Sequence, residues 1–323
     1  MNTKSSLFQK LSEEELQQVI GKNLNRNVRE AELLEGGLFN TTYRVCCGEE
    51  KKNVVLRCGP VNRHLLLPFE ENLMQAEEAV DRLCKTKQIP CSDVLACDTT
   101  KELIDRDYMI VGYIDSVPLS QVPQEQKPGL YREVGTYMKK FHSITSRSFG
   151  KVSYLTSGRS FGGWYEFLIS EVSGMLEKSF LFNAFTREEA RQILLAFQKH
   201  EDCLRQVKVP QLIHTDLWEG NVLASEKDGV YSVAAIIDGD RALFGDVDFE
   251  FASPWMTNGD FFEGYGKDSG GEDFRSEDRT VRRALYLILY DLIEAYVSIA
   301  EYNNPNQYHE SKKLILKSAA RLI

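Results

Sequence analysis

The segment Leu212–Glu250 constrains the chain most, because it sets three polar residues at fixed intervals into apolar, strand-like sequence. Four residues separate Asp216 from Asn221, so one tight loop can direct both side chains toward a common point. Seventeen residues after Asn221, the apolar run Val233–Ile237 ends in Asp238, a carboxylate at the tip of a buried strand. The segment therefore predicts a polar site where a loop meets a strand end.

These residue types suit one kind of chemistry. Mg²⁺ binds through few protein oxygens while it keeps waters and substrate phosphates, so the Asn221 amide and the Asp238 carboxylate are a sufficient protein contribution. Asp216 would orient a hydroxyl group and accept its proton. Phosphoryl transfer is stabilised by metal, cation and alignment of the attacking hydroxyl, and the segment supplies groups for these tasks. We interpret it as a candidate phosphoryl-transfer site.

At these positions the chain resembles the aminoglycoside phosphotransferase and choline kinase-like family, which is related to protein kinases. The resemblance rests on the catalytic-loop pattern and the following strand, carried by His214, Asp216, Asn221 and Asp238. The downstream Gly245-Asp246 with Glu250 resembles the family segment that braces this loop. Protein kinases carry Arg after the His and Phe-Gly after the metal-binding Asp, whereas this chain has Thr215 and Gly239-Asp240.

The resemblance implies an α+β, protein-kinase-like two-lobed fold. The N-terminal lobe, residues 1–113, would bind the nucleotide on an antiparallel sheet with one main helix. A larger, mostly helical C-terminal lobe, residues 114–323, would carry the catalytic loop, the metal site and the acceptor site. A chain of 323 residues with 42% hydrophobic residues is long enough for two such lobes.

A glycine-containing turn is the expected phosphate-covering element. Gly36, Gly37 and Asn40 lie between the end of one strand-like run at Leu34 and the next run, Thr41–Val45. Glycines let backbone amides approach phosphate oxygens. Without other nucleotide-binding residues, however, the same two glycines would form an ordinary turn.

The run Val54–Cys58 predicts a central strand, and alternation places Val55 and Arg57 on one face. The resemblance implies that Arg57 contacts the nucleotide phosphates and that Val55 lies on the adenine side. Arginine cannot lose its charge and can contact two oxygens, so it suits phosphate binding. An exposed arginine on an edge strand is the alternative.

Helical spacing of apolar residues between Pro68 and Lys87 predicts a helix that follows this strand. Glu77 lies near its buried stripe and needs a partner there, whereas Glu78 is rotated away. We expect an ion pair between Glu77 and Arg57. The alternative is that both glutamates lie on a solvated surface.

The apolar run Asp107–Ile114 predicts a further buried strand that leads to the connection between the lobes. The resemblance implies that backbone groups from Val111 to Tyr113 hydrogen-bond the adenine. Any residue can supply such backbone groups, so the side chains give little signal here.

Beyond residue 114 the sequence is mostly helical in pattern. The predicted helices are 129–144, 164–180, 186–206, 278–301 and 307–323, the third opened by a capping box at Thr186. His142 ends the first of them, and we interpret it as a packed residue rather than a catalytic one.

Composition excludes several other classes of protein. The net charge of −9 and the pI near 5.3 argue against nucleic acid or an anionic membrane as the main partner. Seven cysteines without a C-x-x-C motif provide neither a zinc ribbon nor a disulfide framework. No signal peptide of ordinary type and no membrane span is evident, so we expect a soluble, cytoplasmic protein. The oligomeric state is left open.

The region from Trp255 to Arg279 is rich in glycine and acidic residues, and it could attract a cationic acceptor. A solvated loop explains the same composition. Asp240, two residues after Asp238, would point the same way along an extended strand and could bind a second metal or the acceptor. A turn carboxylate paired with Arg241 is the alternative for Asp240.

The sequence thus predicts a phosphotransferase that depends on ATP and Mg²⁺, with GTP left open as the nucleotide, and that acts on a hydroxyl of a small molecule. A nucleotide-binding pseudokinase or scaffold is the alternative from another class. A protein kinase fits less well, because no A-P-E segment follows Asp238. Relatives act on aminoglycosides, macrolides, choline, homoserine, methylthioribose and fructosamines, and the acceptor is not predicted.

Overall fold

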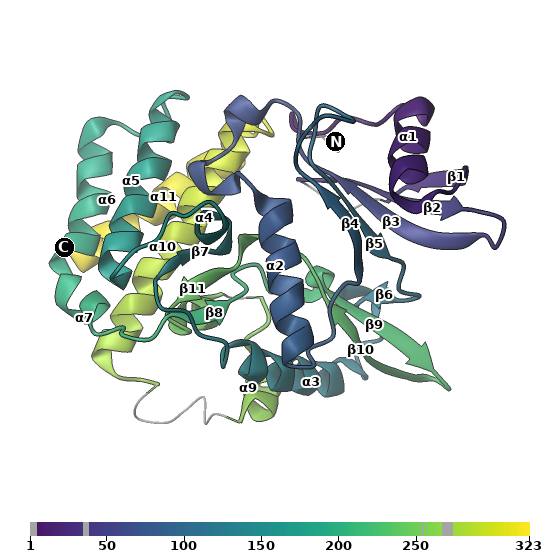
Figure 1. Cartoon of the computed structure of the whole chain (residues 1–323). Helices are drawn as coiled ribbons and strands as arrows, with labels where there is room; N and C mark the ends of the chain where they lie inside the picture. The colour runs from purple at the N-terminus through teal and green to yellow at the C-terminus, as the bar shows by residue number, and fades with distance from the viewer. Residues whose placement is uncertain (1–4, 35–38, 254, 267–273) are drawn as a thin grey trace.

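The computed structural model describes residues 5–34, 39–253, 255–266 and 274–323. Strands dominate the N-terminal part, and helices dominate the part that follows β5 (Figure 1). This is the two-lobed, protein-kinase-like arrangement that the resemblance implies. The boundary after residue 113 stays a prediction.

The N-terminal sheet has five antiparallel strands in the order β1-β2-β3-β5-β4. Their bounds are β1 Val28–Leu33, β2 Thr41–Cys47, β3 Lys52–Cys58, β4 Val94–Asp98 and β5 Tyr108–Gly112. The strand predicted at Val54–Cys58 is therefore central. The turn residues Gly36 and Gly37 lie outside the described residues.

Alternation along β3 divides its side chains between two helices on opposite faces of the sheet (Figure 1). Val54 and Leu56 are buried in a cluster with α1, Glu13–Leu24, whose N-terminus is closed by a capping box of Ser12 and Glu15. Val55 packs beside Met74 of α2, Leu73–Thr86. Arg57 is on this α2 side as well, which directs it toward the helical lobe.

Helix α2 lies between the sheet and the rest of the chain. One face contacts the sheet through Met74, while Ala76 and Val80 are buried in the core of the helical lobe. The helix also packs on the 3-10 turn η5, Gly239–Arg241, which follows the last strand of the candidate site. A residue on the buried face of α2 can therefore reach both lobes.

The helical lobe is built around long helices and two small sheets. Its longer helices are α3 Lys127–Phe141, α5 Trp164–Phe180, α6 Arg187–Lys199, α10 Glu277–Ala300 and α11 Pro305–Leu322. Its shorter helices are α4 Val152–Thr156, α7 Glu201–Arg205, α8 Asp248–Ala252 and α9 Gly259–Tyr265, and it contains the 3-10 turns η3 Leu119–Gln121 and η4 Glu219–Asn221. The 3-10 turns η1 Arg63–Leu65 and η2 Pro68–Glu70 lie between β3 and α2. None of the helices within the described ranges is long and apolar enough to cross a membrane.

The two small sheets carry the segment that opened the sequence analysis. One has the order β10-β9-β6, from Val230–Ile236, Val222–Lys227 and Val117–Pro118. The other has the order β7-β11-β8, from Gly150–Lys151, Leu243–Gly245 and Gln211–Ile213. The catalytic-loop segment therefore leaves one sheet and enters the other, and is fixed at both ends.

Two sequence expectations need correction. The helix expected to run to Gln206 ends at Lys199, because His200 leaves the helical conformation before α7 begins. A solvated loop was one interpretation of the acidic region from Trp255 to Arg279, and it is wrong for α9, which lies within this region and packs on α3. Asp260 and Glu263 of α9 both pair with Arg132 of α3.

The N-terminal segment Ser5–Leu11 and the linker Gly59–Asn72, which joins β3 to α2, attach the two lobes to each other. The Ser6 amide and hydroxyl donate to the Glu301 carbonyl at 3.0 and 2.9 Å. In the linker, the Leu65 carbonyl accepts from the Tyr296 hydroxyl of α10 at 2.5 Å. The entrance to α2 is thus held by the helical lobe.

Helices α3 and α9 approach closely at two glycines, Gly135 of α3 and Gly264 of α9. A Cβ at Gly135 would overlap the Phe261 carbonyl, whereas one at Gly129, also on α3, would meet no atom within 4 Å. We expect Gly135→Ala to cost about 1–3 kcal/mol of unfolding free energy through overpacking. Gly129→Ala should be neutral or stabilising by up to about 1 kcal/mol, because alanine favours helix. Denaturant titrations of both variants test the contact, and equal effects would contradict it.

Glu301, at the end of α10, gives a pH-dependent test of the joint between the lobes. Burial, assisted by the charge of Glu70, raises the pKa of this carboxyl to about 8. In the unfolded chain it ionises near pH ~4.3, so stability falls as pH rises from about 4 to 8, where the folded state retains a proton that the unfolded state has lost.

Replacing Glu301 with glutamine removes this titration while it keeps the shape of the side chain. We expect the Tm of Glu301→Gln to exceed that of the wild type by a margin that grows up to about pH 8 and is constant above it. Thermal melts at a series of pH values measure the margin. Parallel profiles for the two proteins would show that Glu301 does not titrate in this way.

Candidate active site

The catalytic loop begins directly after β8 and ends in η4. Within it, the Asn221 amide nitrogen donates to the Asp216 carbonyl at 2.8 Å and to its carboxylate at 3.1 Å. The two side chains therefore meet, as their spacing in the sequence predicts. Because Asn221 donates through its nitrogen, its amide oxygen remains available as an acceptor. Burial raises the pKa of the Asp216 carboxyl.

His214 fixes the loop rather than presenting a reactive group. The Asp216 amide donates to His214 Nδ1 at 3.3 Å, so Nε2 carries the proton and donates to the Ile237 carbonyl at 3.0 Å. The His214 amide itself donates to the Glu250 carboxylate at 2.6 Å. These bonds connect the loop to the end of β10 and to α8.

Glu250 and His142 form the buried support behind this loop. Glu250 is fully buried on α8, and His142 Nε2 lies 3.6 Å from its carboxylate. His142 Nδ1 lies 2.9 Å from the Tyr265 hydroxyl of α9. His142 is thus a packed residue, as interpreted from the sequence, and it links α9 to the brace of the catalytic loop.

Asp246 has a different position from Glu250, although both follow β11 closely. Its carboxylate accepts from Arg282 at 2.8 Å and from the Tyr286 hydroxyl at 2.7 Å, both on α10. Burial together with the neighbouring Asp248 raises the pKa of the Asp246 carboxyl. Asp246 therefore anchors the segment to α10, and Glu250 is the residue that contacts the catalytic loop.

Arg57 connects the sheet, α2 and the end of β10. Its guanidinium pairs with Glu77, which confirms the expected ion pair, and also with Asp238. Burial alone would lower the pKa of Arg57, but Glu77 and Asp238 outweigh it and raise the pKa. Glu78 instead pairs with Arg82 one turn along the helix, at 2.5 Å on the surface.

Three carboxylates gather around this arginine. Oxygen atoms of Glu77, Asp238 and Asp240 lie within 4.8 Å of one another, a spacing that suits a bound cation. Burial and the charge of Asp238 raise the pKa of the Asp240 carboxyl well above its usual range. For Asp238, burial acts to raise the pKa, but Arg57 and Arg241 together lower it.

The expectation that Asp240 would follow an extended strand is wrong. Asp238 has a φ of 65°, in the left-handed region, and η5 follows at once. The turn brings Asp240 back toward Asp238, and it requires a small residue at Gly239, where a Cβ would lie 2.9 Å from Val80 of α2. The two carboxylates thus converge because the chain turns.

The alternative partner expected for Asp240 is also engaged elsewhere. Arg241 pairs with the buried Glu70 of η2 at 2.9 Å, and its guanidinium carbon lies 5.7 and 5.8 Å from the ring centres of Phe39 and Phe69. Sequence reasoning missed Glu70, because no local pattern relates it to a residue 171 positions away. The pairing attaches the linker Gly59–Asn72 to the active-site turn.

Of the residues expected around the nucleotide base, Val111 lies within the sheet and Tyr113 lies just after the end of β5. Val111 lies inside the sheet, opposite Val55 on β3 and Val94 on β4, so its backbone groups face neighbouring strands. Tyr113 follows the last residue of β5, and Arg44 lies over its ring at 5.9 Å. The backbone beyond Gly112 is therefore better placed than that of Val111 to contact a base.

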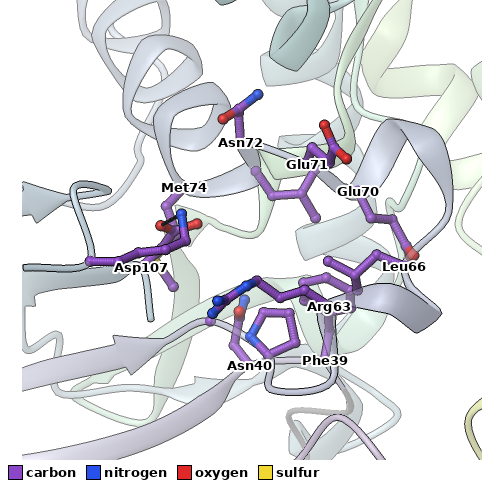
Figure 2. A pocket seen from close by; sticks show the side chains of 13 residues that line it. Phe39, Asn40, Arg63, Leu66, Glu70, Glu71, Asn72, Met74 and Asp107 are labelled. Carbon is purple, nitrogen blue, oxygen red and sulfur yellow. Dashed lines mark ion pairs between the residues drawn. The ribbon is translucent and has the colours of Figure 1, made fainter. Parts of the chain in front are cut away.

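Asn40 is buried and lines a cavity of about 300 Å³ beside the start of α2. Figure 2 shows the cavity between two groups of side chains, with Asn72, Glu71 and Glu70 on one side and Phe39, Asn40 and Arg63 on the other. Arg57, Asp216 and Asp238 do not line this cavity. It is therefore a neighbour of the carboxylate cluster and does not include it.

The sheet, the ion-paired α2 and the Asp–Asn loop together define the class of kinase-like phosphotransferases. The model of the phosphotransferase enzyme family known as APH matches residues 30–291, and the chain belongs to this family. No curated protein matches the chain significantly.

Several solved structures share the fold over nearly the whole chain. A thermostable mutant of aminoglycoside phosphotransferase APH(4)-Ia, in a ternary complex with AMP-PNP and hygromycin B, has a TM-score of 0.66 and 17% identity, over 95% of this chain and 98% of that one. A proposed fructosamine-3-kinase from Thermobifida fusca has a TM-score of 0.65 and 17% identity, with the same coverage. The GDP and kanamycin complex of APH(2")-IIia has a TM-score of 0.61 and 12% identity, over 96% and 99%.

The Arg57–Glu77 pair allows a matched mutational test on two adjacent residues. Glu77→Gln leaves the largely buried Arg57 with one fewer carboxylate, and we expect it to cost about 3–5 kcal/mol of unfolding free energy. Glu78→Gln removes only a surface ion pair and should cost at most about 0.5 kcal/mol. Chemical denaturation compares them, and equal losses would contradict the burial of the Glu77 pair.

Proposed function

We propose that the protein is an ATP- and Mg²⁺-dependent phosphotransferase that moves the γ-phosphate to a hydroxyl of a small molecule. The observation that carries the proposal is the convergence of the Asp216–Asn221 contact, the Asp238–Asp240 turn and the Arg57–Glu77 pair in one region of the protein. Membership of the phosphotransferase family supports the reaction class.

The proposed roles follow from the chemistry of each side chain. Asp216 would orient the acceptor hydroxyl and take its proton, since its carboxylate is held by Asn221 and its raised pKa favours proton uptake. Arg57 would neutralise the nucleotide phosphates, and Glu77 would orient it. Asn40, with Gly36 and Gly37, would cover the phosphates.

The donor set fits magnesium. Asn221 offers an amide oxygen and Asp238 a carboxylate, and Asp240 is close enough to Asp238 to contribute to a second ion. When bound, the ion would stabilise charge on the transferred phosphoryl group. The high pKa of Asp240 indicates that three carboxylates near one arginine favour either a proton or a metal ion between them.

A purine nucleotide is supported by the neighbours, which include complexes with AMP-PNP and with GDP. ATP is the proposed donor, with GTP as the alternative, and Val55 and the backbone near Tyr113 would contact the base. The proposed location is the cytoplasm, as expected from the sequence.

The acceptor is proposed to be a small hydroxyl compound, since neighbours bind hygromycin B and kanamycin. Trp218, two residues after Asp216, is 43% exposed and could stack on a ring of the acceptor. Attraction of a cationic acceptor by α9 receives less support, because Asp260 and Glu263 pair with Arg132.

A transfer screen over hydroxyl compounds, with ATP and Mg²⁺, tests the proposal. With any acceptor found, we expect Asp216→Ala to lower kcat by about 10²–10⁴-fold, because proton acceptance and positioning are lost together. Asp228→Ala is the matched control, since Asp228 lies in the β9–β10 hairpin turn, and it should retain activity.

Two results would contradict the proposal in different ways. Full activity of Asp216→Ala would show that another group accepts the proton. Thermal stabilisation by ATP and Mg²⁺ without turnover across the acceptor panel would favour a nucleotide-binding scaffold.

A further inference from the structure

Thr215, between His214 and Asp216, has an unusual backbone conformation. Its φ is 68°, in the left-handed region that favours glycine. Of the non-glycine residues with positive φ in the described part of the chain, Thr215 has the only branched Cβ. Such a conformation persists only where the surrounding structure enforces it, and it suggests a functional reason.

The conformation turns the chain sharply at the start of the catalytic loop. It allows the Asp216 amide to reach the ring of His214, two residues earlier, at 3.3 Å. Asp216 can then face Asn221 at 3.1 Å. Glycine would adopt this turn without strain, so the turn alone does not account for a threonine.

The hydroxyl of Thr215 provides the reason. Oγ1 donates to the carbonyl of Arg241 at 3.0 Å. The same carbonyl accepts from the buried Lys151 Nζ at 3.2 Å, so both of its lone pairs have a donor. Arg241 is the last residue of η5, the turn that Asp238 opens.

Glycine at position 215 could not make this bond. The bond therefore joins the residue before the proposed base to the end of the turn that carries the proposed metal ligands. Thr215 is itself 6% exposed, so water cannot readily replace Arg241 as its partner.

We propose that Thr215 is a positioning residue, which holds the Asp216 loop and the Asp238–Arg241 turn in register through its hydroxyl. The inference rests on the proposed phosphotransferase function. Since the register matters for alignment of the hydroxyl with the phosphoryl group, the effect of its loss should fall on kcat more than on KM for the nucleotide.

Three substitutions separate the hydroxyl from the backbone strain. Thr215→Val keeps the branched shape without the hydroxyl, and we expect kcat to fall about 10–100-fold while KM for ATP changes less than about threefold. Thr215→Ser keeps the hydroxyl and should stay within about threefold of wild-type kcat. Thr215→Gly should lower kcat as the valine does, although its Tm is not lowered to the same extent, because strain is relieved.

A matched control tests strain by itself. Lys51, in the turn between β2 and β3, also has a positive φ, of 50°. Lys51→Gly should raise or keep Tm and leave kcat unchanged. A purely structural role for Thr215 would instead make kcat follow the folded fraction, which active-site titration measures.

The outcomes distinguish this inference from the proposed function. If Asp216→Ala abolishes transfer but Thr215→Val and Thr215→Gly turn over like the wild type, the positioning role is wrong and the function stands. If the wild type transfers phosphate to no acceptor of the panel, the proposed function itself is wrong. Loss of kcat in the valine and glycine variants, restored in the serine variant, supports the inference.

Discussion

The arrangement depends on the ion pairs of the largely buried Arg57 guanidinium. The guanidinium is supplied by the sheet, and it is neutralised by Glu77 of α2 and by Asp238 at the end of β10. Because a buried charge without partners is costly, the sheet, the helix and the β10 end have to meet at this point. The same requirement places the Asp238–Asp240 turn close to the catalytic loop, so the pair that joins the lobes also assembles the candidate site.

A second set of contacts holds the catalytic loop against the end of β10, the turn η5 and α8. His214 binds the Ile237 carbonyl and Glu250 accepts from the His214 amide, while Thr215 reaches the Arg241 carbonyl. Each bond uses a backbone group on one side, so it fixes the path of the chain as well as a side chain. These bonds therefore determine the direction in which the Asp216 carboxylate points.

The sequence predicted the parts of the site that repeat a local pattern. The Asp216–Asn221 spacing, the buried face of α2 and the pairing of Glu77 with Arg57 follow from periodicity and from the resemblance, and the structure has them. It could not predict contacts between distant segments, such as Glu70 with Arg241, because no residue pattern encodes which turns will meet. It also failed where backbone conformation departs from the regular strand, at Asp238, since an extended run was assumed to continue.

The attachment of the linker Gly59–Asn72 has a consequence for control of the enzyme. The linker is bonded to α10 through Leu65 and to the active-site turn through Glu70, and α2 follows directly. A helix held at its entrance and again at Glu77 is poorly placed to swing outward as an on–off switch. The rate of the proposed reaction would then depend on the amount of the protein and on the concentrations of its ligands, and not on a movement of α2.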